Sequence, residues 1–199
     1  MRVVLASGNP GKVREFQHML ADTGVELEPQ TDHRVTPPPE EAVTFVENAL
    51  AKARHATRET GLPAIADDSG LEVDALDGAP GVHSARYAGE HGDDAENNAK
   101  LLQELAGIAA ARRTARYRAV LVFLRGPEDP APIIAEGTWN GRIAEEPRGA
   151  GGFGYDPLFE LDDGRTAAEL PAEEKNLVSH RGRALAELRR RLDALTARD

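Results

Sequence analysis

Cysteine is absent from the 199 residues of this sequence. The chain therefore has no disulfide bond, no thiolate nucleophile and no thiolate metal ligand. Apolar runs long enough to cross a bilayer are also missing. The apolar segment after Met1 is interrupted as early as Asn9 and Pro10, which makes it too short for a secretory signal. We expect a cytoplasmic protein with no membrane partner.

Positive charge is scarce, because 24 Lys and Arg residues face 34 Asp and Glu residues, for a net charge of −10. Such an acidic balance argues against sequence-blind binding of nucleic acid. A small phosphorylated substrate stays compatible with it if cations gather locally or a metal screens the phosphates. The hydrophobic content of 40% indicates a folded chain, and no repeat or linker divides it. We predict a single domain over 1–199 with two lobes.

The stretch Ile65-Ala66-Asp67-Asp68-Ser69-Gly70 places two carboxylates directly after apolar residues. It predicts a buried strand that ends at an acidic tip, followed by a second strand over 71–76. Adjacent carboxylates repel each other, and a divalent cation bound between them and a phosphate would relieve that repulsion, since hard cations take oxygen ligands. The alternative is an ordinary turn closing the strand, since these are turn residues.

The N-terminal segment predicts a strand over 2–6, a tight loop, and a helix whose apolar residues start at Val13. Asn9 can cap this helix and Pro10 suits its first turn. Free N–H groups at the helix start can bind an anion, and Lys12 adds a full charge. The spacing is not that of the usual P-loop, because Val13 stands where that motif has Ser or Thr. A plain strand-to-helix turn is an equal alternative.

A second helix is predicted over 43–59, preceded by Glu40. Glu40 is either a first-turn acid favoured by the helix dipole or a metal ligand. Glu47, Asn48 and Lys52 lie close to a second face of this helix, where surface solubility is the ordinary explanation for Glu47 and Lys52. A further helix is predicted over 93–105.

Residues 114–124 and 133–143 are expected to form a long antiparallel pair of strands, which makes the sheet mixed. The irregular segment 78–87 is a candidate functional loop, and Arg86 at its end would suit a phosphate. The alternative is an ordinary loop with a surface arginine.

Near the C-terminus, Gly149-Ala150-Gly151-Gly152-Phe153-Gly154-Tyr155-Asp156-Pro157 combines many glycines with two aromatic residues. This composition indicates backbone close to something flat, with Phe153 or Tyr155 stacking on a base and Asp156 accepting hydrogen bonds. A Gly-rich hairpin is the alternative. Ser179 can cap a last helix over 183–195, with His180 and Arg181 in its first turn. Because the helix dipole disfavours cations there, the two residues are candidates for contacting an anion or a carbonyl oxygen.

Six motifs in this order closely resemble the inosine triphosphate pyrophosphatase family, also called the Ham1-like non-canonical purine NTP pyrophosphatases. The resemblance runs from residue 2 to about residue 195. The motifs are Ser7-Gly8-Asn9-Pro10-Gly11-Lys12, Glu47-Asn48-Ala49, Ala66-Asp67-Asp68-Ser69-Gly70, the segment Gly78 to Tyr87, Gly151-Gly152-Phe153-Gly154-Tyr155-Asp156-Pro157 and Ser179-His180-Arg181.

The resemblance implies an α/β fold with a long mixed central sheet, helices on both sides, and an active-site cleft between two lobes. It implies hydrolysis of dITP, ITP and XTP to the monophosphate and pyrophosphate, which removes deaminated purines before polymerases use them. The implied cofactor is Mg²⁺, one or more ions per subunit, with Mn²⁺ as a substitute. A homodimer is the implied assembly.

Residue roles also follow from the resemblance. Asp68 matches the catalytic proton acceptor and a metal ligand, and Glu40 matches an acidic metal-site position. Because Glu41-Ala42 follows Glu40 where many members have Thr-Gly, the ligand set among Glu40, Glu47 and Asp67 stays open. The implied substrate-binding residues are Ser7, Gly8, Asn9, Pro10, Gly11, Lys12, Ser69, Phe153, Gly154, Tyr155, Asp156, Lys175, His180 and Arg181.

Two other functions compete with this one. A Maf-like pyrophosphatase shares the broad fold and the N-terminal loop but prefers dTTP, UTP or CTP, and the Gly-Phe-Gly-Tyr-Asp and Ser179-His180-Arg181 motifs favour the purine enzyme. A non-catalytic nucleotide-binding regulator would need the loops but not the two adjacent aspartates.

Overall fold

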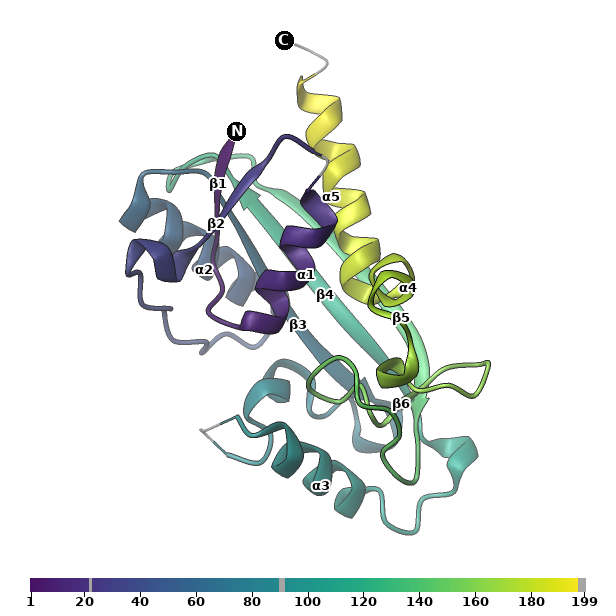
Figure 1. The fold of residues 1–199 in the computed structure, drawn as a ribbon. Coiled ribbons are helices and arrows are strands. Elements are labelled where there is room, and N and C mark those ends of the chain that lie inside the picture. The colour runs from purple at the N-terminus through teal and green to yellow at the C-terminus, as the bar shows by residue number, and fades with distance from the viewer. Residues whose placement is uncertain (22, 90–91, 197–199) are drawn as a thin grey trace. The chain divides into compact units, whose positions relative to one another are not determined.

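The computed structural model describes residues 1–21, 23–89 and 92–196 (Figure 1). The helices are α1 (Pro10–Leu20), α2 (Phe45–Thr60), α3 (Asp94–Glu104), α4 (Ala172–Val178) and α5 (His180–Thr196). The strands are β1 (Arg2–Leu5), β2 (Glu26–Pro29), β3 (Ala64–Val73), β4 (Thr114–Leu124), β5 (Ile133–Ile143) and β6 (Phe159–Glu160).

The strands form one six-stranded sheet in the order β2-β1-β3-β4-β5-β6. β1 pairs in parallel with β2 and with β3, whereas β5 pairs antiparallel with β6. Parallel and antiparallel neighbours in the same sheet confirm the predicted mixed α/β fold. β4 and β5 are adjacent, as the sequence predicts.

The chain divides into two compact units. The first comprises Met1–Asp68, Ala119–Gly137 and Arg181–Asp199, and the second comprises Ser69–Arg118 and Thr138–His180. The boundaries between the units fall inside β3, β4, β5 and α5 instead of in separate linkers.

The first unit has two cores, because neighbouring strand residues point to opposite faces of a sheet. Val3, Leu5 and Ile65 pack with α1 and α5, including Phe16 and Leu185. Residues at the alternate positions, which include Val4, Ala64 and Ala66, pack against alanines of α2. These three helices therefore cover both faces of this part of the sheet, as Figure 1 shows.

The predicted end of the acidic strand is wrong. β3 continues through Asp67, Asp68 and Ser69 to Val73, and all ten of its residues are buried or partly buried. Asp67 therefore continues the alternation of Ile65, and Asp68 continues that of Ala66. Strand pairing and burial in the centre of the sheet outweigh the preference of these residue types for turns. The expected second strand over 71–76 is the end of β3 followed by a 3-10 turn over Asp74–Leu76.

The second unit has its own core, built mainly on aromatic and leucine side chains such as Leu71, Leu101, Tyr117, Trp139 and Phe159. The segment predicted as an irregular loop over 78–87 contains a short 3-10 helix, Gly81–Arg86. α5 begins at His180, three residues before the predicted start, so His180 and Arg181 do occupy its first turn.

The Gly-rich segment turns back on itself in the second unit. Gly152 has a φ of +73°, and a Cβ there would lie 2.0 Å from a carboxylate oxygen of Asp156. A Cβ at Gly149 would meet the backbone of Ala168 at 2.6 Å. These glycines are thus required because the protein's own chain lies close to them. The sequence predicts instead that this backbone lies close to a flat group such as a base.

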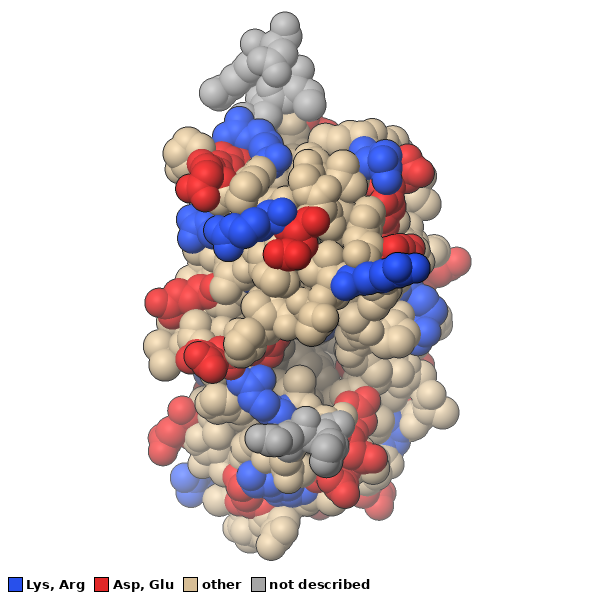
Figure 2. Space-filling view, turned by 90° about the vertical axis from the view of Figure 1, so that its left-hand side faces the viewer, with Lys and Arg blue, Asp and Glu red and all other residues tan. Residues whose placement is uncertain are grey.

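None of the helices within the described ranges is long and apolar enough to cross a membrane. On the face displayed in Figure 2, acidic and basic side chains alternate instead of gathering by sign.

Candidate functional site

The loop before α1 is organised by its own side chains. Asn9 is the N-cap of α1, and its Oδ1 accepts hydrogen bonds from the N–H groups of Gly11 (2.8 Å) and Lys12 (3.1 Å). The N–H of Asn9 donates to Oγ of Ser7 at 3.2 Å. The predicted cap is confirmed, and it satisfies N–H groups that the sequence led us to expect free for an anion. The side chain of Lys12 is therefore the clearest source of positive charge in this loop.

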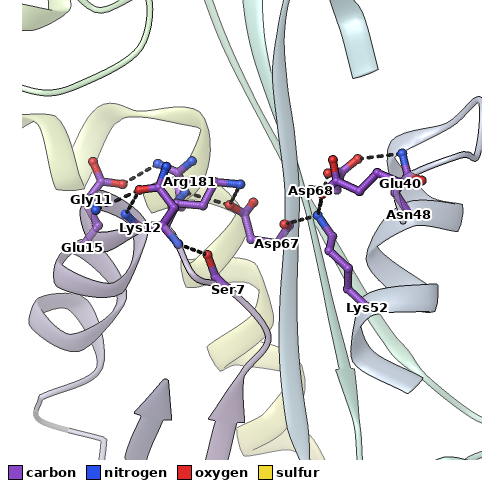
Figure 3. Close-up of polar contacts among 11 residues, drawn as sticks. Ser7, Gly11, Lys12, Glu15, Glu40, Asn48, Lys52, Asp67, Asp68 and Arg181 are labelled. Carbon is purple, nitrogen blue, oxygen red and sulfur yellow. Dashed lines mark hydrogen bonds and ion pairs between the residues drawn. The ribbon is translucent and has the colours of Figure 1, made fainter. Parts of the chain in front are cut away.

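Asp67 lies on the α1 and α5 face of β3, where two cations contact its carboxylate (Figure 3). Its Oδ2 lies 2.9 Å from Nζ of Lys12 and 3.2 Å from Nε of Arg181. The Arg181 guanidinium also donates to Glu15 of α1. Lys12, Asp67, Arg181 and Glu15 thus form a series of charges of alternating sign, in which Asp67 and Arg181 are buried and the two end residues are partly buried.

Burial alone would raise the pKa of Asp67, whose side chain is fully enclosed. Lys12 and Arg181 outweigh this effect and hold the pKa of the carboxyl well below its usual range. Asp67 is therefore ionised at neutral pH and serves as the counterion of both cations.

Asp68 lies on the opposite face of β3, toward α2 (Figure 3). Its Oδ1 accepts from Nζ of Lys52 at 2.7 Å, and its Oδ2 accepts from Nδ2 of Asn48 at 3.3 Å. Lys52 also donates to Glu40 Oε1 and to the carbonyl oxygen of Asp67, both at 2.9 Å. Lys52 therefore bridges the two acids that the sequence proposed as metal ligands.

Burial raises the pKa of Asp68, and the neighbouring Glu40 adds to that effect, while Lys52 and Lys12 oppose it. A raised pKa suits a carboxylate that must take up a proton. Burial alone would lower the pKa of Lys52, but Asp68 and Glu40 outweigh it and raise this pKa. Lys52 is therefore a buried, charged ammonium.

Two carboxylates, Glu40 and Asp68, face a common position and supply hard oxygen donors. This set suits Mg²⁺, which binds through one or two carboxylates and takes further oxygens from water and phosphates. No group of three or more His, Asp or Glu residues able to hold a metal occurs in the described parts of the chain. Glu47 is exposed on the surface, and its carboxylate accepts from the Thr44 hydroxyl at the start of α2.

In the second unit, a buried ion pair joins Lys175 to Asp156. Nζ of Lys175 lies 2.5 Å from Oδ2 of Asp156, and the same ammonium lies 5.0 Å from the centre of the Phe153 ring. Asp156 also accepts from the N–H of Phe153 at 2.9 Å and from the Tyr117 hydroxyl at 3.3 Å. Asp156 thus anchors the Gly-rich segment, and Lys175 holds a positive charge over an aromatic ring.

His180 stacks on Tyr117, with ring centres 4.5 Å apart and an angle of 10° between the ring planes. Tyr117 in turn lies against Phe159 at 4.6 Å. The imidazole is therefore fixed in orientation by the aromatic core of the second unit.

The first turns of α3 hold the backbone of Gly154 from both sides. Asp94 Oδ2 accepts from the N–H of Gly154 at 2.7 Å, and Asn98 Nδ2 donates to its carbonyl oxygen at 2.9 Å. Gly154 has a φ of +63°, a conformation that glycine adopts readily. These contacts fix the path of the chain between Phe153 and Asp156.

The predicted site residues thus fall into two sets. The first unit holds the phosphate-loop residues 7–12, Glu40, Asp68 and Arg181, and the second holds Ser69, residues 153–156, Lys175 and His180. In the first unit, Lys12 and Arg181 share Asp67 on one face of β3, whereas Glu40 and Asp68 share Lys52 on the other face. In the second unit, Lys175 lies against both Asp156 and Phe153.

Comparison with known proteins identifies the family to which this chain belongs. The model of the Ham1 family matches residues 3–191. This chain belongs to the Ham1 family. The Ham1 protein of Coxiella burnetii is a solved structure with 49% identity and a TM-score of 0.90, covering 98% of this chain and 99% of its own. The fold expected from the resemblance is thereby confirmed.

Curated Ham1 relatives match nearly the whole chain. A protein of Thioalkalivibrio sulfidiphilus is 57% identical over 96% of this chain and 98% of its own length. Another, from Escherichia coli O157:H7, is 54% identical over 98% of both chains. Both are named dITP/XTP pyrophosphatase.

In this Ham1 protein, the contacts of Lys52 and Glu15 do not follow from the sequence. Surface solubility is the ordinary explanation for a helical lysine, yet Lys52 is only 7% exposed. One signal was available, because Lys52 follows Asn48 by four residues and so shares its face of α2. Glu15 gives no comparable signal, since its partner Arg181 lies 166 residues away.

Proposed function

We propose that this chain is a nucleoside triphosphate pyrophosphohydrolase that converts dITP, ITP and xanthosine triphosphates to the monophosphate and pyrophosphate. Such an activity keeps deaminated purines out of DNA and RNA. Membership of the Ham1 family and the names of the relatives support this function. We further expect a cytoplasmic homodimer, as the family resemblance implies.

The proposal depends most on one observation: the two faces of β3 present different charged groups. Asp67 contacts the lysine of the phosphate loop, while Asp68 contacts a second acid, Glu40, through Lys52. A triphosphate needs cations along its tail and a base beside its reacting phosphorus. Lys12, held by Asp67, would supply one of these cations, and Asp68 would supply the base.

In the proposed reaction, the oxygen of a water molecule forms a bond to the α-phosphorus. The bond from that phosphorus to the bridging oxygen of the β-phosphate breaks, and pyrophosphate leaves with the electron pair. Asp68 accepts the proton of the water, a step worth roughly 10²–10⁴-fold in rate. Lys12 attracts the anionic tail, and Lys52 limits the negative charge around Asp68.

Glu40 and Asp68 are the residues that would hold Mg²⁺. When bound, the ion would neutralise phosphate charge and screen it from the attacking water. Glu47 is a poorer candidate, since its carboxylate takes part in the cap of α2.

Base selection should depend on the atom at purine C6. Hypoxanthine and xanthine have a carbonyl acceptor there, whereas adenine has an amino donor. A site with N–H donors aimed at this atom rejects adenine, and buried mismatches of this kind discriminate by roughly 10⁴-fold. His180, held by its stack on Tyr117, is the candidate donor in the second unit, and Phe153 is the candidate stacking surface.

A steady-state panel of ITP, dITP, XTP, ATP, GTP, dTTP, UTP and CTP tests the proposal, with pyrophosphate and orthophosphate measured separately. We expect pyrophosphate from the deaminated purines in the presence of Mg²⁺ and none in EDTA. Equal cleavage of ATP and ITP would contradict the account of base selection. Preference for pyrimidine nucleotides would contradict the purine function itself.

A further inference from the structure

Lys52 lies between the two acids that are the candidate metal ligands. Its ammonium has three hydrogens, and three acceptors surround it: Glu40 Oε1 at 2.9 Å, Asp68 Oδ1 at 2.7 Å and the Asp67 carbonyl oxygen at 2.9 Å. The ammonium is therefore held in one place by both carboxylates and by the backbone of β3.

This position matters because a metal ion would use the same carboxylates. A divalent cation bound between Glu40 and Asp68 would lie within a few ångströms of a full positive charge. Repulsion between a charge of +2 and a charge of +1 a few ångströms apart weakens metal binding by about tenfold or more, and the effect is larger in a buried site than in water. With Lys52 present, two carboxylates and one ammonium leave only one net negative charge to attract the metal.

We propose that Lys52 acts as an internal counterion that keeps divalent metal weakly bound until a triphosphate arrives. The inference rests on the proposed function for the identity of the metal ligands. Phosphate oxygens bring the additional negative charge and the further ligands that Mg²⁺ prefers. Metal binding then follows nucleotide binding, and Glu40 and Asp68 stay paired and ordered in the meantime. Lys52 is a positioning residue in this account.

The test is a titration of the nucleotide-free protein with Mn²⁺, in which electron paramagnetic resonance counts the free ion. Lys52→Met removes the charge and keeps an unbranched side chain of similar reach. We expect the variant to bind Mn²⁺ at least about tenfold more tightly than the wild type, because the repulsion is gone. An affinity equal to that of the wild type, or weaker, would overturn the inference.

Lys100→Met is the matched control, since Lys100 forms a more exposed ion pair with Glu104 on α3. It should leave the Mn²⁺ affinity at the wild-type value, and a gain equal to that of Lys52→Met would overturn the assignment to Lys52.

Loss of Lys52 leaves two carboxylates without their shared cation, so the variant can fail to fold. Circular dichroism detects this failure. In that case the Mn²⁺ affinity of the wild-type protein tests the inference. A dissociation constant weaker than about 100 µM without nucleotide supports the inference, and a tighter one overturns it. Neither measurement involves hydrolysis. A protein that binds Mn²⁺ as expected but cleaves no purine nucleotide would therefore refute the proposed function alone.

Discussion

Asp67 and Asp68 are neighbours in the chain, yet their carboxylates lie on opposite faces of β3 (Figure 3). Asp67 pairs with Lys12 and Arg181, and Asp68 pairs with Lys52. The pKa of Asp67 is lowered, whereas that of Asp68 is raised. Two residues of identical chemistry thus differ in role because the strand turns them toward different partners.

Asp68→Asn should lower kcat on ITP by roughly 10²–10⁴-fold or more, because the amide cannot accept the proton of the attacking water. Asparagine retains the shape of the side chain, and Lys52 keeps Glu40 and the Asp67 carbonyl oxygen as acceptors, so we expect a smaller fall in melting temperature than for Asp67→Asn. Pyrophosphate release and a thermal melt by circular dichroism measure the two quantities. Asp77→Asn, at an exposed position in the left-handed conformation that Asn tolerates, is the control. A variant at position 68 that keeps most of its kcat would remove Asp68 from the mechanism.

Asp67→Asn should instead lower stability at neutral pH. It leaves Lys12 and Arg181 close together without their shared counterion, and breaking a buried ion pair costs roughly 3–5 kcal/mol. Urea unfolding of wild type and variant at pH 7 measures this loss. Asp162→Asn, which changes an exposed carboxylate, should have little effect.

The difference in unfolding free energy between wild type and Asp67→Asn should depend on pH. The folded-state pKa of Asp67 is depressed, so the stability that its charge contributes is fully present above the ordinary value of 3.8. It is lost as the pH falls below that value toward the folded-state pKa. The stability difference between wild type and Asp67→Asn should therefore shrink between pH 5 and pH 3, to an extent on the order of 1 kcal/mol for each pH unit below about 4. A difference that grows toward pH 3 would show that Asp67 is not the ionised counterion.

Lys12→Met should raise KM for ITP by about 10- to 100-fold, the effect expected when a hydrogen bond to a charged group is lost. Its ammonium is the charged group of the phosphate loop, and its ion pair with Asp67 fixes its position beside β3. Steady-state kinetics at low and high salt provide the measurement. Arg14→Met, two residues further on the exposed face of α1, should change KM little. Equal effects of the two variants would indicate general charge attraction instead of a specific contact.

Local features of this protein follow from its sequence more fully than distant contacts do. The Asn9 cap and the start of α3 at Asp94 depend on residues within three or four positions of each other, so spacing alone predicts them. The predicted end of β3 is wrong because aspartate is common in turns, whereas here Lys12, Lys52 and Arg181 compensate the buried charges of Asp67 and Asp68. Arg181 lies 114 residues from Asp67, and no local pattern joins them.

The last prediction concerns α3, which no sequence motif connected to the Gly-rich segment. Asp94 and Asn98 hold the N–H and the carbonyl oxygen of Gly154. If residues 153–156 bind the purine, loosening this backbone should weaken substrate binding without removing any group that touches the reacting phosphorus. We expect Asp94→Ala and Asn98→Ala each to raise KM for ITP by about fivefold, the value of one ordinary hydrogen bond, with kcat nearly unchanged.

Asn97 offers the matched control for this prediction, because it lies on the same helix and its side chain also forms hydrogen bonds with backbone groups. Its amide contacts Ala85 and Ala88 and not Gly154. Asn97→Ala should therefore destabilise the second unit, as a lower melting temperature would show, with a smaller effect on KM. If all three variants change melting temperature and KM in the same proportion, α3 contributes only to stability. A separation of the two effects would instead show that helix α3 positions the purine-binding segment through the backbone of one glycine.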